Sequence, residues 1–361
     1  MSFDTFIDNR TPFDVQSHVQ MTAEGQERLV LLLSASFTAD AAGKVGLADD
    51  PLPVTFADTP WGNPALSSIR YEADIAARKV RPEVIVNGSA YAPGGQPADA
   101  VTVGLQIADI RKILQVTGDR VHHLGAFSAP TRFLRMPLTW ERAFGGTTDA
   151  GDRDPRNPVG IGHAGAHSAD PEVRSDAANI TRPDQVVAAQ GDRPEPVGYG
   201  SVGRGWQPRL AFAGTYDQSW LDTQWPLPPF DFDPRHDQSA PADQQSAGIG
   251  PGVTATLMNL TPEGRWEFRL PSVTAPVRLL RDRGIEEVQF IADTVLIEPD
   301  LRRITLKARM SFITRRTAPK LREVIVGHVS PVFLNARRKE KAYVNPLGGN
   351  GTLQGAAVWA G

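Results

Sequence analysis

One short segment gathers the side-chain types that acid–base chemistry and metal binding use. Within seven residues the chain places three carboxylates and one imidazole, at Asp231, Asp233, His236 and Asp237. Such groups can bind a hard cation or transfer protons, which makes a metal-assisted hydrolase one alternative. The other alternative is a structural turn around Pro234, in which the aspartates accept hydrogen bonds from backbone N–H groups. We favour the turn, and we expect no catalytic, cofactor-binding or metal-binding residue.

The remaining candidates for chemistry lack the context that they need. Two glycine-rich stretches, 160–165 and 198–203, match the spacing of a dinucleotide fingerprint, but neither shows a preceding strand and a following helix. His163 and His167 are four residues apart, yet the glycine between them favours a loop over a zinc-binding helix face. The chain has no Gly-x-Ser-x-Gly elbow and no cysteine, which excludes thiolate zinc sites and cysteine nucleophiles. We therefore expect a binding protein without a cofactor, and no enzyme.

The composition argues against several classes of partner. Charged residues make up 22% of the 361 residues and the formal net charge is −3, so neither nucleic acid nor a membrane is an expected partner. The first ten residues lack the pattern of a secretory signal. The longest apolar run, 29–33, is far too short to cross a bilayer. These features predict a cytoplasmic protein.

The elements that must carry any site are predicted to be strands. Thirty prolines and 33 glycines disfavour long helices, because both residue types interrupt them. Buried or alternating apolar runs predict strands at 29–37, 45–47, 83–90, 101–107, 113–116, 288–291, 294–297 and 303–312. We expect a mainly β fold of antiparallel, sandwich-like sheets with long ordered Gly/Pro-rich loops and few short helices.

The same patterns divide the chain into three parts. Residues 1–130 form a β-rich N-terminal part, and residues 131–314 combine a loop-rich stretch with further strands. Residues 315–361 form a basic and then Gly-rich tail, in which 331–341 can form a short helix. Because the strand pattern ends near Phe312, we expect the sheets to fold without the tail.

Several short phrases, in a fixed order, resemble one bacterial family. They are PLTWERAFGG at 137–146, NPVG at 157–160, PVGYG at 196–200, WQPR at 206–209, AGTYD at 213–217 and LPPFDFD at 227–233. Two further matches lie upstream, at 88–95 and 118–120, so the resemblance covers about residues 1 to 314. The family is domain of unknown function 2169 (DUF2169).

What the resemblance implies is an accessory protein of the type VI secretion system. Such a protein would act as an adaptor or chaperone that loads an effector, or a PAAR-type tip, onto the valine-glycine-repeat spike. No catalytic residue is established for the family, so the resemblance implies no active-site residue in this chain. The residues that we expect at the centre of the shared feature are Trp140, Arg142, Phe144, Trp206, Arg209, Tyr216, Asp217 and Trp220.

Two questions stay open at this point. The eight residues can contact a partner protein or hold the loops together, and an Arg209–Asp217 ion pair is one predicted internal tie. A glycan-binding β-sandwich that uses exposed tryptophans is a third functional alternative, beside the adaptor and the hydrolase.

Overall fold

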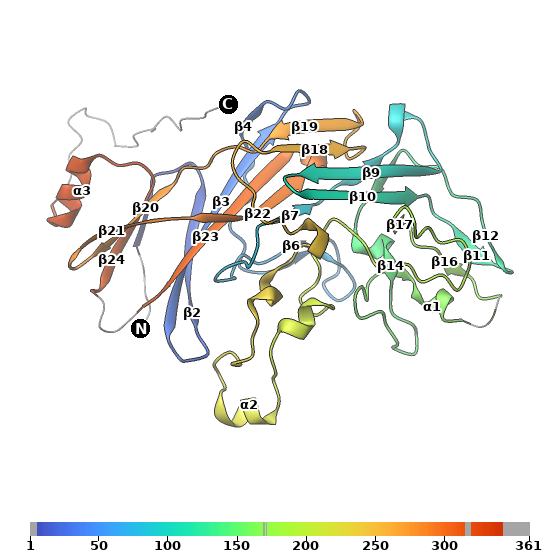
Figure 1. Ribbon diagram of the computed structural model, residues 1–361, viewed down its shortest axis with the longest axis horizontal. Coiled ribbons are helices and arrows are strands. Elements are labelled where there is room, and N and C mark those ends of the chain that lie inside the picture. Colours follow the sequence, from blue (N-terminus) through green and yellow to red (C-terminus); the bar gives the residue numbers. More distant parts are fainter. Residues whose placement is uncertain (1–5, 169, 171, 315–318, 342–361) are drawn as a thin grey trace.

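The computed structural model describes residues 6–168, 170, 172–314 and 319–341 (Figure 1). The fold is mainly β and is built from several largely antiparallel sheets, as predicted. The described residues contain three short α-helices, namely α1 (His163–Ala166), α2 (Gln218–Thr223) and α3 (Pro331–Arg338). No helix in this part of the chain is long and apolar enough to span a membrane.

A six-stranded sheet lies at the centre of the molecule. Its strands, in spatial order, are β2 (Asp14–Met21), β3 (Glu27–Ala39), β23 (Arg303–Ile313), β22 (Ile291–Glu298) and β7 (Glu83–Val86), with β4 (Val45–Leu47) added to β3. β22 and β23, which include the predicted strands 294–297 and 303–312, form an antiparallel hairpin. β7 pairs with β22 in the parallel direction, and the other pairs are antiparallel.

The two faces of this sheet differ in chemistry, because successive side chains of a strand point to opposite faces. Along β23, Ile304, Leu306 and Ala308 join the main apolar core. Arg303, Lys307 and Arg309 lie at the alternate positions and are also buried. One face of the sheet is therefore apolar. The other, the ionic face, combines these buried charged side chains with two small apolar clusters.

Two further sheets share the apolar core with the six-stranded sheet. The five-stranded sheet contains β17 (Ile180–Thr181), β10 (Ile110–Thr117), β9 (Ala100–Ile107), β18 (Thr254–Met258) and β19 (Arg265–Arg269). The four-stranded sheet contains β1 (Phe6–Asn9), β24 (Leu321–Val326), β20 (Pro276–Arg281) and β21 (Gly284–Gln289). Figure 1 shows the four-stranded sheet at the left of the molecule and the five-stranded sheet right of the centre.

Shorter elements fix the loops between these sheets. The remaining strands are β5 (Thr59–Pro60), β6 (Ile69–Tyr71), β8 (Ser89–Tyr91), β11 (Val121–His123), β12 (Ala126–Phe127), β13 (Arg135–Pro137), β14 (Phe144–Gly145), β15 (Ile161–Gly162) and β16 (Ser175–Asp176). The 3-10 helices are η1 (Pro93–Gly95), η2 (Trp140–Arg142), η3 (Arg209–Phe212), η4 (Pro234–Asp237), η5 (Ala242–Gln244) and η6 (Pro299–Leu301).

The expectation that the strands end near Phe312 is wrong. β24 lies between β1 and β20, and its residues Val324, Ile325 and Val326 are completely buried. The predicted short helix is present as α3, which packs Phe333 beside Ile325. The first part of the predicted tail therefore belongs to the fold, whereas residues 342–361 lie outside the described residues. The sequence pattern missed β24 because Arg322 and Glu323 interrupt its short apolar run.

The predicted parts 1–130 and 131–314 share both large sheets. β3 of the first part pairs along its length with β23 of the second, and β9 pairs with β18. The chain therefore crosses between these parts repeatedly.

Candidate interaction site

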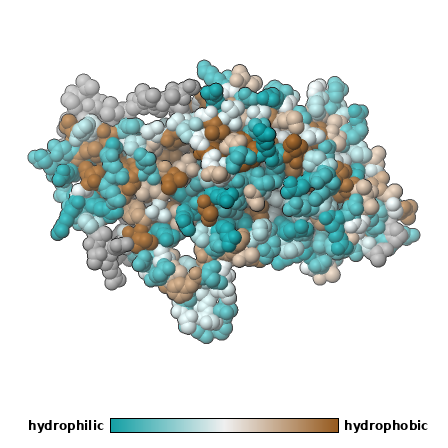
Figure 2. Space-filling model, viewed as in Figure 1, coloured by the Kyte–Doolittle hydropathy of each residue, from teal (hydrophilic) through white to brown (hydrophobic). Residues whose placement is uncertain are grey.

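A projecting arm, residues 210–232, carries five large apolar side chains that are exposed to solvent. The arm holds α2 at its tip and extends away from the sheets (Figure 1). Trp225 is 65% exposed and Phe230 is 72% exposed. The other large exposed apolar residues of the arm are Leu210, Tyr216 and Leu221. Figure 2 shows the arm as a protrusion coloured mainly tan and white, with some teal.

The arm holds a defined shape through its own hydrogen bonds. The carboxylate of Asp217 caps α2 by accepting a hydrogen bond from the backbone N–H of Trp220, at 2.9 Å. The indole N–H of Trp220 donates to the carbonyl oxygen of Leu227, at 3.0 Å, which joins the two sides of the arm. The rings of Tyr216 and Trp220 meet edge to face, with their centroids 4.8 Å apart.

The turn between β2 and β3 supports the arm from one side. The side-chain amide of Gln224 donates to the carbonyl oxygen of Ala23, at 2.8 Å, and to that of Pro228, at 2.9 Å. A Cβ atom added at Gly25 would lie 3.5 Å from the side chain of Leu227, so the turn and the arm approach closely. The aromatic side chains are thus presented on an ordered support.

Arg209 anchors the base of the arm in the body of the protein. Its buried guanidinium donates to the carbonyl oxygens of Val202 and His236 and to the carboxylate of Glu72, at 2.5, 2.9 and 2.5 Å. The predicted Arg209–Asp217 pair is therefore wrong, because each side chain has other partners. Arg209 is buried beneath the arm, whereas Asp217 lies on its exposed helix.

Glu72 joins three cations at this base. Besides Arg209, its carboxylate lies 2.9 Å from Arg204 and 3.7 Å from the ammonium group of Lys79. Burial acts to raise the pKa of Glu72, but the charges of Lys79, Arg209 and Arg204 outweigh it and lower this pKa to about 2. Glu72 is consequently ionised at neutral pH and holds the three cations in place.

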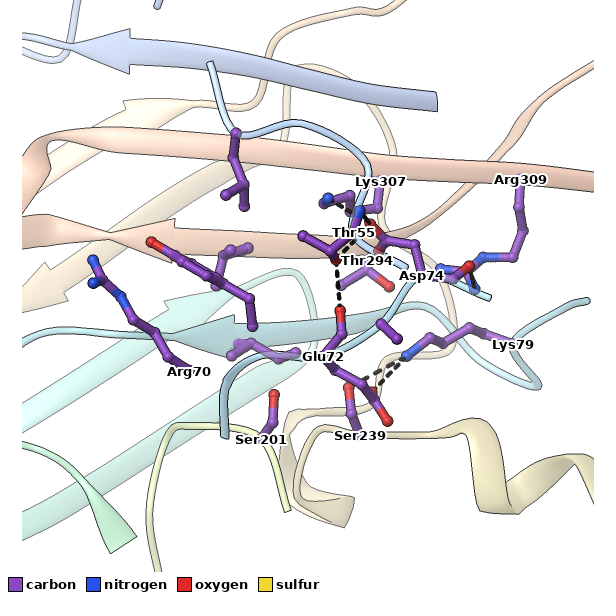
Figure 3. A pocket seen from close by; sticks show the side chains of 15 residues that line it. Thr55, Arg70, Glu72, Asp74, Lys79, Ser201, Ser239, Thr294, Lys307 and Arg309 are labelled. Carbon is purple, nitrogen blue, oxygen red and sulfur yellow. Dashed lines mark hydrogen bonds and ion pairs between the residues drawn. The ribbon is translucent and has the colours of Figure 1, made fainter. Parts of the chain in front are cut away.

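The ion pairs continue from Glu72 onto the ionic face of the six-stranded sheet (Figure 3). Lys79 also forms an ion pair with Glu83. The ammonium group of Lys307 lies 2.7 Å from the carboxylate of Asp74, and the guanidinium of Arg309 lies 2.5 Å from the carboxylate of Asp293. A small cavity of about 40 Å³ beside these pairs has room for a few water molecules. Buried ions are tolerated only when they are paired, and the carboxylates named here all have cationic partners. The arrangement can hold the loops and the arm on the sheet.

Four of the remaining predicted residues also hold loops together. The indole N–H of Trp140 donates to the carbonyl oxygen of Gly200, and its ring meets that of Trp206 edge to face at 5.9 Å. Arg142 donates to Asp119 and Asn179, at 3.0 and 3.1 Å. Phe144 is buried in a small second core with Ala166, Ala177, Ala178 and Val187.

The eight predicted residues therefore divide into two groups. Trp140, Arg142, Phe144, Trp206 and Arg209 connect loops or anchor them to the body, whereas Tyr216, Asp217 and Trp220 build the arm. Sequence reasoning did not place Trp225 and Phe230 in this set, although both are more exposed than Tyr216, the most exposed aromatic residue of the set. One signal was available, since residues 210–232 contain six aromatic residues and no Lys or Arg.

The acidic segment that suggested hydrolysis, residues 231–237, forms a turn where the second side of the arm returns to the body of the protein. Asp231 accepts hydrogen bonds from the backbone N–H and the hydroxyl of Thr215, at 3.0 and 2.7 Å. Asp233 caps η4 by accepting from the backbone N–H of Arg235, at 2.9 Å, and pairs with its guanidinium. These hydrogen bonds lower the pKa of both carboxyls. The turn interpretation is confirmed for Asp231 and Asp233.

The other two members of that segment face different surroundings. The imidazole of His236 lies against the ring of Phe232, and burial lowers its pKa. Asp237 lies 3.8 Å from Arg204, and burial raises its pKa. No group of three or more metal-binding side chains comes together among the described residues.

The first glycine-rich stretch has a local context that the sequence did not predict. The two-residue strand β15 leads directly into the four-residue helix α1, so His163 lies in a short helix instead of a loop. The rings of His163 and His167 are 4.2 Å apart, and His163 also contacts Asp152 at 3.2 Å.

Comparison with known proteins identifies the family. Residues 24–309 match the family described as "Uncharacterized protein conserved in bacteria (DUF2169)". This match covers well over half of the chain, so the chain belongs to that family. No curated protein and no solved structure matches it.

Proposed function

We propose that this member of the DUF2169 family is a binding protein that holds another protein through its arm and performs no catalysis. The observation that carries the proposal is the exposure of Trp225 and Phe230 on an arm with a fixed base. Aromatic side chains are enriched at the centres of protein interfaces, where they contribute much of the binding energy. A support that is ordered before binding reduces the entropy lost on association.

In the form that the sequence resemblance suggests, the protein is a cytoplasmic adaptor or chaperone of type VI secretion. Its cargo would be an effector or a PAAR-type tip, delivered to the valine-glycine-repeat spike. Two of the phrases that carry the resemblance, 213–217 and 227–233, flank α2 and form the two sides of the arm. The shared sequence thus coincides with the surface that is suited to a partner.

The geometry favours neither alternative function. Asp231, Asp233, His236 and Asp237 do not converge on a common point, which a hydrolase would require. The exposed rings of Trp225 and Phe230 stand on a projecting arm, whereas sites for small ligands are typically concave.

The test is affinity capture of the tagged protein from its native host, followed by mass spectrometry of the proteins retained. The informative variant is Trp225→Ser with Phe230→Ser. Leu301→Ser is the matched control, because Leu301 is also an exposed apolar residue, 49% exposed, but lies in η6. We expect the wild type and the control to retain a spike, PAAR-type or effector protein, and the arm variant to lose it.

Two outcomes would count against this proposal. Retention of the same protein by the arm variant would remove the arm from the interaction. Recovery of no spike, PAAR-type or effector protein by the wild type would remove the secretion role.

A further inference from the structure

The five-stranded and four-stranded sheets cover the apolar face of the six-stranded sheet but leave a gap between them. The five-stranded sheet ends at β19 and the four-stranded sheet begins at β20, and the link between them, 270–275, crosses this gap. A cavity of about 250 Å³ lies at this seam. Leu33, Leu306 and Ala308 form its buried floor, and Val273, Ala275 and Phe290 line it from the links.

The register of the central strands explains why the space is left open. Leu33 of β3 is paired with Ala308 of β23, and Ala308 is paired with Ala292 of β22. Two of the three residues in this row across the sheet are alanines, whose short side chains leave space above the sheet. The link above the row has small side chains, among them Ala275.

The lining of the cavity carries no charged side chain. Eight of its ten residues are apolar, and the two polar ones, Thr274 and Gln289, are neutral and exposed to solvent. A charged ligand would lose its hydration there without gaining an ionic partner. Protein interiors are close-packed and rarely keep a void much larger than a water molecule. An apolar engineered cavity of about 150 Å³ takes up benzene or xenon.

We propose that the seam cavity is a binding site for an uncharged apolar molecule, such as an alkyl chain or a small aromatic group with one neutral hydrogen-bonding end. The apolar portion lies on Leu33, Leu306 and Ala308. The polar end lies toward Thr274 and Gln289. This site is separate from the arm, and the proposal does not depend on the proposed function.

The test uses the full-length protein and the uncharged fluorescent probe N-phenyl-1-naphthylamine, whose emission rises in apolar surroundings. We expect one saturable site from which 1-octanol displaces the probe, with octanoate at least tenfold weaker. The variant Ala292→Leu narrows the cavity and should weaken probe binding at least tenfold. Ala100→Leu is the matched control, because Ala100 is also an exposed strand residue and lies outside the cavity.

A second variant keeps the test decisive if Ala292→Leu does not fold. Thr274→Trp places a large ring over the cavity from the exposed link and should have the same effect on probe binding. The proposal is overturned if the wild type shows no saturable binding. It is equally overturned if the folded cavity variants bind the probe as tightly as Ala100→Leu does.

Discussion

Replacing Glu72 by Gln tests whether the base of the arm depends on the charge of this carboxylate. Glu72 is buried, and its pKa falls from 4.5 to about 2 in the folded protein. At about 1.4 kcal/mol per pKa unit, this difference corresponds to about 3 kcal/mol of stabilisation at neutral pH. The substitution also leaves the buried Arg209 and Lys79 with less compensating charge. We therefore expect Glu72→Gln to lower the free energy of unfolding at pH 7 by about 3 kcal/mol or more.

The pH dependence of the effect has a definite sign. A carboxyl whose pKa is lower in the folded state stabilises the protein above the unfolded value and loses this contribution as it becomes protonated. For Glu72 the loss falls between about pH 4.5 and about pH 2, so the difference between wild type and Glu72→Gln should shrink across this interval. Well above pH 5 the difference should be constant.

The assay is urea unfolding followed by tryptophan fluorescence at pH 7, 4 and 3. Glu286→Gln is the control, because Glu286 pairs with Arg281 at 3.0 Å but is half exposed, and such pairs contribute about 1 kcal/mol or less. An effect of Glu72→Gln no larger than that of the control would refute the reasoning. So would an effect that stays the same from pH 7 to pH 3.

Two further perturbations address the arm and the last strand. Asp217→Ala removes the cap of α2 and should destabilise that helix by about 1 kcal/mol. Hydrogen exchange of the arm amides should therefore become faster. The control Asp222→Ala, in the same helix, should change the exchange rates little. Unchanged exchange in Asp217→Ala would contradict the capping role. Ending the chain at Thr314 removes β24 and exposes the core face of β20, so the truncated protein should lose cooperative unfolding in urea. A sharp transition, with the same dependence of the unfolding free energy on urea as in the full-length protein, would show that β24 is dispensable.

Local patterns in the sequence were sufficient to predict much of the sheet structure. β3 and β23 were predicted because their burial extends over many residues and leaves long apolar or alternating runs. β24 was missed because only its last three residues are fully buried, and its first half carries charged side chains. The partner of Glu323, Arg337 at 2.9 Å, comes from α3, and no local pattern could reveal this pairing.

The candidate site was predictable only in part. The two phrases at 213–217 and 227–233, and the predicted residue Trp220 between them, lie in the segment that forms the arm. The exposure of Trp225 depends on the arm projecting from the body, and this projection is a property of the whole fold. Glu72 had no recognisable motif, because its partners Arg204 and Arg209 follow more than 130 residues later.

The pairing of β3 with β23 delays completion of the central six-stranded sheet until late in synthesis. Leu33 pairs with Ala308, so the two strands are separated by about 270 residues of chain. At a synthesis rate of about 5 to 20 residues per second, an interval on the order of ten to fifty seconds passes before β23 is made. During that interval β3, which contains the apolar run 29–33, has only β2 and β4 as neighbours, and the edge that will receive β23 stays open. Such an edge is a template for pairing with other chains. The nascent chain is therefore most exposed to edge-to-edge association before β23 has been synthesised.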